Sequence, residues 1–197
     1  MASPIDICNT ALVHIGETPN ISSIEPPEGS AHAQKCARFY PLARDETLEA
    51  YNWSFARARR VLATLADNAS AFAYAYQLPS DCLKPRTLLP EGYTTADEKG
   101  EGEDFLVEGD VIYTDAPGAT LLYTFKLTAA TKFSPLFAEA VSALLGYYLA
   151  GAISKDEGTQ RRLYQMWQLS LGRGAQSNAN IGKTTYDLRP DWIKVRS

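Results

Sequence analysis

Gly182, Lys183 and Thr184 match the end of a phosphate-binding loop, the nucleotide motif that this sequence comes closest to containing. A complete motif needs a glycine five residues before its second glycine, and Ser177 stands at that position. The motif also needs a strand before it and a helix after it, whereas a helical pattern precedes the triplet and Pro190 follows soon after. We therefore expect no nucleotide site and no bound cofactor.

Two cysteines and two histidines are the residues that could ligate a metal ion. His32 and Cys36, four residues apart, share a face of one predicted helix. Cys8 and His14 fall on different sides of another helix, and no C-x-x-C spacing exists. Cysteines inside apolar stripes are usually core residues. We expect no metal site.

Residues suited to catalysis are sparse. Nucleophilic catalysis needs a base beside the nucleophile, and neither of the two histidines lies in a recognisable catalytic loop. A carboxylate pair for glycoside cleavage stays open, because two acids can meet from any positions in the sequence. Nine acidic residues accompany one lysine between Glu91 and Asp115, and the part from Asp97 to Asp104 is typical of a solvated loop. We predict no catalytic residue and a non-enzymatic protein.

Arg57, Arg59 and Arg60 form the most suggestive basic cluster. On a strand, Arg57 and Arg59 project from one face, where they could meet phosphate or an acidic partner. The net charge of −4 argues against a non-specific nucleic-acid binder. We favour an oligomer contact, in which these arginines pair with the acidic stretch of a neighbouring copy, over a DNA contact.

Large apolar groups continue into the segment 177–197, which shows neither a helical nor a strand period. A tryptophan in an irregular segment is unfavourable in water, and aromatic residues with arginine mark binding hot spots. Two interpretations stand equal: this arm binds a partner, or it folds back on its own helices. The candidate partner-binding residues are Tyr186, Leu188, Arg189, Trp192, Ile193 and Arg196.

Helical spacing of apolar residues returns four times along the chain. Ser3-Pro4 and Ser134-Pro135 are cap-plus-proline starts, and Gly16 ends the first helix. The second helix carries Pro41 in its interior, which predicts a kink or a break. The predicted helices cover 4–15, 30–51, 134–153 and 157–176.

Between the second and third helices the period changes to two from Phe55 onward. The pattern predicts a half-buried strand at 72–78, a strand with a weaker pattern at 83–89, and a hairpin about Glu108-Gly109-Asp110. The clearest strand pattern is at 120–127, where the apolar side chains share one face. The order of elements predicts an α+β fold: an antiparallel bundle of about four helices with an inserted small antiparallel β-sheet and an extended C-terminal arm. The predicted domains are 1–54 with 132–176, the helical bundle; 55–131, the inserted β subdomain; and 177–197, the arm.

The stretch 136–153 is apolar enough to raise the question of a membrane span. It contains Glu139 and Ser142, and Lys132 is the one basic residue close before it. A helix that is apolar nearly all round belongs at the centre of a bundle, so we expect no membrane. The N-terminus lacks a secretory signal and the three cysteines are too scattered for a disulfide framework, which predicts a protein made in a reducing cytosol.

Several stretches resemble one family, the head-to-tail adaptors, or tail tubular protein A, of T7-like short-tailed phages and their prophage relatives. The first stretch runs from Ile7 to Leu12 and ends at Ile15-Gly16-Glu17. The second stretch runs from Cys36 to Glu46. The others are Trp53-Ser54-Phe55-Ala56-Arg57 and the run from Tyr74 to Leu83. The resemblance covers about residues 4 to 172, and its motifs are structural rather than catalytic.

The resemblance implies a virion protein of the head–tail junction, assembled in the bacterial cytoplasm. It implies a ring of copies, usually twelve, docked beneath the portal protein, with a tail nozzle protein below and DNA passing through the bore without sequence-specific binding. Two alternatives remain: a cell-wall hydrolase using paired carboxylates, and a small DNA-binding packaging or completion factor that acts through Arg57, Arg59 and Arg60.

Overall fold

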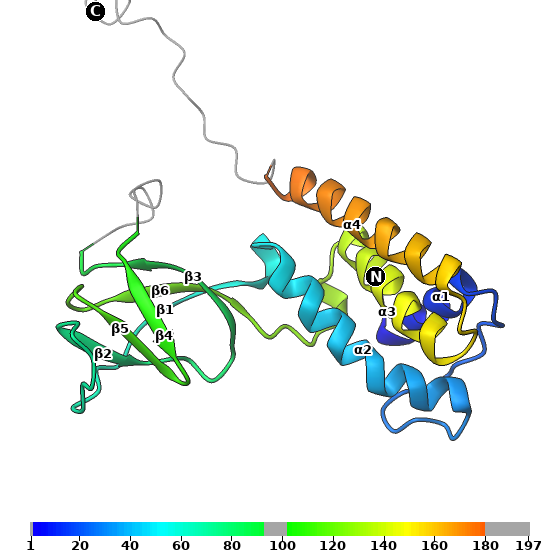
Figure 1. The fold of residues 1–197 in the computed structure, drawn as a ribbon, viewed down its shortest axis with the longest axis horizontal. Helices are drawn as coiled ribbons and strands as arrows, with labels where there is room; N and C mark the ends of the chain where they lie inside the picture. The colour runs from blue at the N-terminus through cyan, green and yellow to red at the C-terminus, as the bar shows by residue number, and fades with distance from the viewer. Residues whose placement is uncertain (1, 93–101, 180–197) are drawn as a thin grey trace, which may run out of the picture.

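The computed structural model describes residues 2–92 and 102–179, and their elements are those of an α+β fold (Figure 1). Helices gather at one end of the molecule and strands at the other. The helices are α1 (Pro4–His14), α2 (Ala31–Ala50), α3 (Pro135–Ala152) and α4 (Glu157–Ala179). The strands are β1 (Arg57–Val61), β2 (Tyr74–Gln77), β3 (Cys82–Leu89), β4 (Phe105–Glu108), β5 (Val111–Thr114) and β6 (Thr120–Phe125).

Serine caps begin three of the helices, and two of them, Ser3 and Ser134, are the caps that the sequence predicts. At α1 the Ser3 hydroxyl accepts from the Asp6 backbone N–H at 3.0 Å, and the Asp6 carboxylate accepts from the Ser3 N–H at 3.1 Å. Ser30 of α2 and Ser134 of α3 each accept from the N–H three residues on. These bonds satisfy N–H groups that have no partner within the helix, so the starts are fixed locally.

Helix α3 is the element against which α1, α2 and α4 all pack. Among the described residues it is the one helix long and apolar enough to cross a membrane, yet 56% of it is buried inside the protein. That burial is typical of a core helix. Its buried residues are Phe137, Ala140, Val141, Ser142, Ala143, Leu144, Leu145, Gly146, Leu149 and Ala150.

Two predicted boundaries differ from the structure. Helix α2 continues through Pro41, so of the predicted kink or break, no break occurs. Buried neighbours on both sides, Tyr40 and Ala43, hold this turn in the core and offset the missing hydrogen bond. Helix α4 extends to Ala179, so 177–179, assigned to the arm, are helical.

The described β region contains two three-stranded antiparallel sheets, ordered β1-β6-β3 and β2-β5-β4. The prediction of a single sheet is therefore wrong. Side chains from both sheets build one apolar cluster, which includes Tyr76, Leu88, Ile112 and Leu121. Strand β6 is buried on both faces instead of one, because residues 121–124 are all buried. A two-sided core needs a second layer, which the second sheet supplies.

Arg86 of β3 joins the strands to the end of α2. Its Nη2 donates to the backbone carbonyl oxygens of Leu48 (3.3 Å), Glu49 (3.1 Å) and Tyr51 (2.8 Å), and its Nε donates to Oγ1 of Thr124 (2.9 Å). The last carbonyls of a helix have no partner within it and carry partial negative charge, so a guanidinium suits them. Arg86 therefore makes several of the hydrogen bonds by which the helical and β parts meet.

Replacing Arg86 with Met is expected to lower the free energy of unfolding by about 2 kcal/mol, because α2 loses its charged cap and Thr124 its partner. Urea unfolding followed by circular dichroism measures the change. Lys84→Met is the control, since Lys84 is exposed and makes one 3.3 Å bond to the Glu49 carbonyl. Equal effects of the two substitutions would contradict the role given to Arg86.

Two glycines of α4 offer a second test of the core. A Cβ on Gly174 would lie 2.6 Å from the buried Trp53 ring, whereas a Cβ on Gly172 would meet nothing within 4 Å. Gly174→Ala is expected to lower the unfolding free energy by about 1–3 kcal/mol through overpacking. Gly172→Ala is expected to raise it by about 0.5–1 kcal/mol through helix propensity. Thermal unfolding of both variants checks the opposite signs, and a stabilising Gly174→Ala would contradict this packing.

Candidate functional site

The basic cluster predicted from the sequence lies on β1, which among the described residues is an edge strand that pairs with β6. Arg57, Arg59 and Arg60 are all exposed. The alternation of a strand places Arg57 and Arg59 on one face, as predicted, and Arg60 on the other. Arg60 pairs at 3.7 Å with Asp81.

The C-terminal candidates lie outside the described residues. These are Gly182, Lys183 and Thr184 of the incomplete phosphate-loop motif and the partner-binding candidates Tyr186, Leu188, Arg189, Trp192, Ile193 and Arg196. Their role stays a prediction.

The four residues considered for a metal ion do not converge. Cys8 and Cys36 meet between α1 and α2 as buried free thiols, and their mutual hydrogen bond, with burial, raises the pKa of Cys8. His14 lies instead beside Ser142, and His32 lies 3.7 Å from the Glu17 carboxylate. Within 2–92 and 102–179 no group of three His, Cys, Asp or Glu side chains could hold a metal ion.

His14, Ser142 and Glu139 line a shallow pocket between α1 and α3, which brings together the residue types of a nucleophilic site. The geometry does not suit that chemistry. The Ser142 hydroxyl is buried, donates to the Glu139 backbone carbonyl at 2.8 Å and lies 3.5 Å from Nε2 of His14. Burial, reinforced by the charge of Arg162, lowers the pKa of His14. The arrangement holds a neutral histidine in a helix contact.

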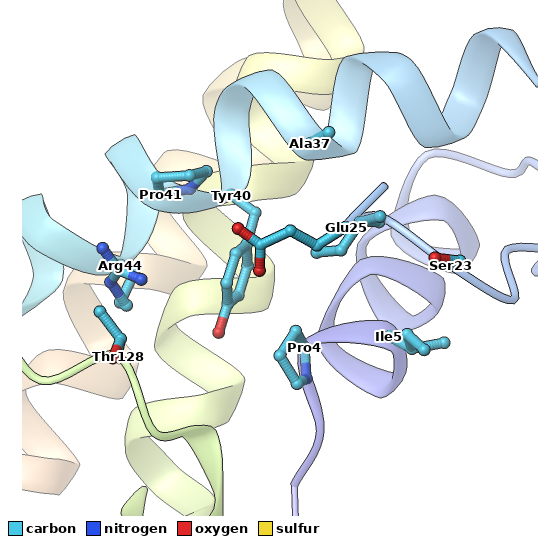
Figure 2. Close-up of a pocket in the computed structure, with 10 residues that line it drawn as sticks. Pro4, Ile5, Ser23, Glu25, Ala37, Tyr40, Pro41, Arg44 and Thr128 are labelled. Atoms are coloured by element: carbon cyan, nitrogen blue, oxygen red, sulfur yellow. The ribbon is translucent and has the colours of Figure 1, made fainter. Parts of the chain in front are cut away.

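A larger pocket, which we call the Tyr40 pocket, lies between α1, α2 and the loop that joins them (Figure 2). Its volume is about 430 Å³. Figure 2 shows the Tyr40 ring extending from α2 toward the space between Pro4 and Thr128, with Glu25 reaching across it from the loop. The lining residues are Pro4, Ile5, Ser23, Ile24, Glu25, Ala37, Tyr40, Pro41, Arg44 and Thr128.

The hydroxyl of Tyr40 is the unusual group in this pocket. Tyr40 is only 4% exposed, and its hydroxyl oxygen has no hydrogen-bond partner among the described residues. Burial raises the pKa of Tyr40 to about 12, so the group is a neutral donor at pH 7. Buried polar groups without partners are rare in folded proteins and call for an explanation.

The charged residues that line the Tyr40 pocket are Arg44 and Glu25. Arg44 is nearly buried and pairs with Asp45 at 2.7 Å, and Asp45 also pairs with Lys126 at 3.0 Å. Arg44 therefore brings a guanidinium that is already neutralised, while Glu25 is exposed. The pocket can offer a carboxylate acceptor and apolar walls, whereas the Tyr40 hydroxyl oxygen is itself buried.

The sequence analysis did not predict this pocket. The signal available was weak: a tyrosine within a stripe of alanine, cysteine and leucine carries a hydroxyl that must find a partner. The loop and Thr128, which complete the pocket, come from distant parts of the chain.

A scan against protein-family models finds no match to the chain, and a search of curated proteins finds none either. The function must therefore be argued from the residues and their arrangement.

Two buried tyrosines test whether the Tyr40 hydroxyl is unpartnered. Tyr40→Phe is expected to leave the unfolding free energy unchanged or raise it by up to about 1 kcal/mol, because no hydrogen bond is lost. Tyr76→Phe is expected to lower it by about 1–2 kcal/mol, because the Tyr76 hydroxyl donates to the buried Ala116 carbonyl at 2.9 Å. Chemical unfolding of both variants gives the comparison; equal losses would mean that Tyr40 has a structural partner.

The lowered pKa of His14 predicts that the free energy of unfolding decreases as the pH is lowered. The unfolded chain binds a proton near pH 6.5, whereas the folded protein resists it, so stability is full above that pH and is lost below it. The slope reaches at most about 1.4 kcal/mol per pH unit until the folded His14 titrates. Unfolding at pH 7.5 and 5.5 should show the loss in the wild type and in His32→Gln, and a smaller loss in His14→Gln. An unchanged loss in His14→Gln would assign it to another group.

Proposed function

We propose that the protein is a structural head-to-tail connector of a phage particle. Copies, twelve in the arrangement that the family resemblance implies, form a ring under the portal protein. The ring lets DNA pass and gives the tail nozzle protein its attachment surface. The protein is made in the bacterial cytoplasm and ends at the head–tail junction of the virion.

The observation that carries the proposal is the exposed basic edge of β1 in an acidic chain. Arg57 and Arg59 lie on a strand with one free side, in a protein of net charge −4. The stretch from Glu91 to Asp115 holds nine acidic residues and one lysine. A chain with a basic strand and an acidic stretch at different places can join to copies of itself in a head-to-tail manner.

Head-to-tail contacts close into a ring when the rotation between neighbours divides a full turn. The acidic balance also suits a DNA channel, because an anionic wall repels phosphates and lets the duplex slide. In this proposal the helices form an antiparallel bundle that carries the β region, and the arm reaches the portal.

The decisive experiment is electron microscopy of the protein mixed with its cognate portal. Rings of the protein stacked on the portal support the proposal. A protein that binds DNA with a steep salt dependence and leaves the portal bare would support the DNA-binding alternative. Peptidoglycan cleavage that one Asp or Glu substitution abolishes would support the hydrolase.

Charge reversal on β1 tests the predicted subunit contact. Arg57→Glu with Arg59→Glu places like charges opposite the acidic stretch of a neighbour, so ring formation on the portal is expected to fall at least tenfold. The unfolding free energy should change by less than about 0.5 kcal/mol, because both side chains are exposed. Arg161→Glu, an exposed change on α4, is the control. Normal rings from the double variant would remove β1 from the interface.

A further inference from the structure

Four strands lie at the edges of the two described sheets: β1, β2, β3 and β4. Two of them have a further partner beyond their sheet. Gln77 of β2 donates its backbone N–H to the Ala63 carbonyl at 3.0 Å. Leu88 of β3 accepts from the Glu103 N–H at 2.9 Å. Strands β1 and β4 have no such second partner among the described residues, so the outer side of each is a place where another strand can pair.

The outer faces of β1 and β4 combine exposed apolar side chains with opposite charges. Val61 of β1 is 70% exposed, and Leu106 of β4 is 43% exposed. The alternation of a strand places Val61 on the same face as Arg57, and Leu106 on the same face as Glu108. Arg57 and Glu108 are both exposed. Each strand therefore offers an apolar group beside a charge that the other strand complements.

Charge decides which of these edges can pair. Two copies of β1 side by side would bring arginines close to arginines, and two copies of β4 would bring Glu108 and its acidic neighbours close to one another. Like charges on adjacent strands destabilise a sheet, and charged edges commonly prevent pairing in this way. Pairing of β1 with β4 brings opposite charges together instead. Because the two edges are different surfaces of one chain, this contact is head-to-tail.

One register satisfies both the faces and the charges. Ala58 of β1 and Val107 of β4 pack on the apolar cluster of the β region, so both belong on the same side of a joint sheet. In an antiparallel pair, Ala58 opposite Val107 places Arg57 opposite Glu108. A parallel pair with the same two charges opposite would have little overlap, because Arg57 begins β1 and Glu108 ends β4.

We propose that β1 of one copy adds to the outer side of β4 of a second copy, antiparallel and with Arg57 opposite Glu108. Val61 and Leu106 then become diagonal neighbours on the outer face, where each covers part of the other. The β1-β6-β3 sheet of one copy continues into the β2-β5-β4 sheet of the next, and both sheets lie at the end of the molecule away from the helices (Figure 1). The inference rests on the proposed function, since it names the edge by which neighbours in the ring are joined.

Charge exchange within the full-length chain tests the pairing. Arg57→Glu is expected to weaken self-association about tenfold, because two carboxylates then face each other. Adding Glu108→Arg should restore association to within about twofold of the wild type, because opposite charges meet again. Arg57→Glu with Glu157→Arg has the same net charge as the rescued chain, but its second change lies on α4, so association should stay weak. All three positions are exposed, which leaves folding unaffected. Sedimentation equilibrium at millimolar chain concentration measures the association.

Cysteine cross-linking tests the register. Arg59→Cys in one full-length chain and Leu106→Cys in another would stand directly opposite each other, at a separation that a disulfide can span. Both chains carry Cys82→Ala, because the other two cysteines are buried. Oxidation of the mixture with copper phenanthroline should give a covalent dimer. Val107→Cys in place of Leu106→Cys is the matched control; it lies one residue along and on the opposite face, so the yield should fall about tenfold.

The two assays contain no portal, so they separate this pairing from the connector role. A cross-link in register, together with rescue by Glu108→Arg, supports the pairing. No covalent dimer at millimolar chain, equal yields at positions 106 and 107, or no rescue overturns it. If the strands pair as described while no ring forms on the portal, the connector role is wrong and the pairing stands. Normal rings on the portal from chains that fail to cross-link would mean the reverse.

Discussion

The need to cover α3 governs the arrangement of the other elements. Ten of its eighteen residues are buried, and an apolar helix of this kind is stable in water only when neighbours remove its surface from solvent. Helices α1, α2 and α4 each supply part of that cover. Once α2 is held on α3, its last carbonyls have a fixed position, and Arg86 ties β3 to them. The placement of the strands thus follows from the burial of one helix.

Most buried polar groups of the described chain join structural elements. Thr47 is an example: its hydroxyl accepts from the Trp167 indole N–H at 3.2 Å, and its carbonyl accepts from the Trp53 indole N–H at 2.9 Å, so α2, α4 and the segment after α2 meet there. Such satisfied contacts are the rule in protein interiors. Tyr40 departs from that rule, because its buried hydroxyl oxygen has no hydrogen-bond partner among the described residues.

Local signals explain what the sequence predicted well. A serine cap, or a cap followed by proline, depends on neighbours in sequence, so helix starts at Pro4, Ala31 and Pro135 could be read directly. The division of the strands into two sheets could not, because β1 pairs with β6 across the intervening strands and the choice depends on which apolar faces meet. The Tyr40 pocket escaped for the same reason, since Thr128 reaches it from beyond the whole β region. The α+β class could be predicted from the order of the elements alone. The site could not, because it depends on contacts between elements that are distant in the sequence.

The position of α3 in the chain has a consequence for biosynthesis. During translation α1 and α2 emerge first, the strands follow, and α3 leaves the ribosome before α4 exists. The side of α3 at Gly146, where Leu163 of α4 packs, stays uncovered for that interval. A chain in which α4 has not yet formed therefore exposes part of an apolar helix that has the hydropathy of a membrane segment, and exposed apolar surface of this kind favours aggregation. Packing of α4 ends that exposure.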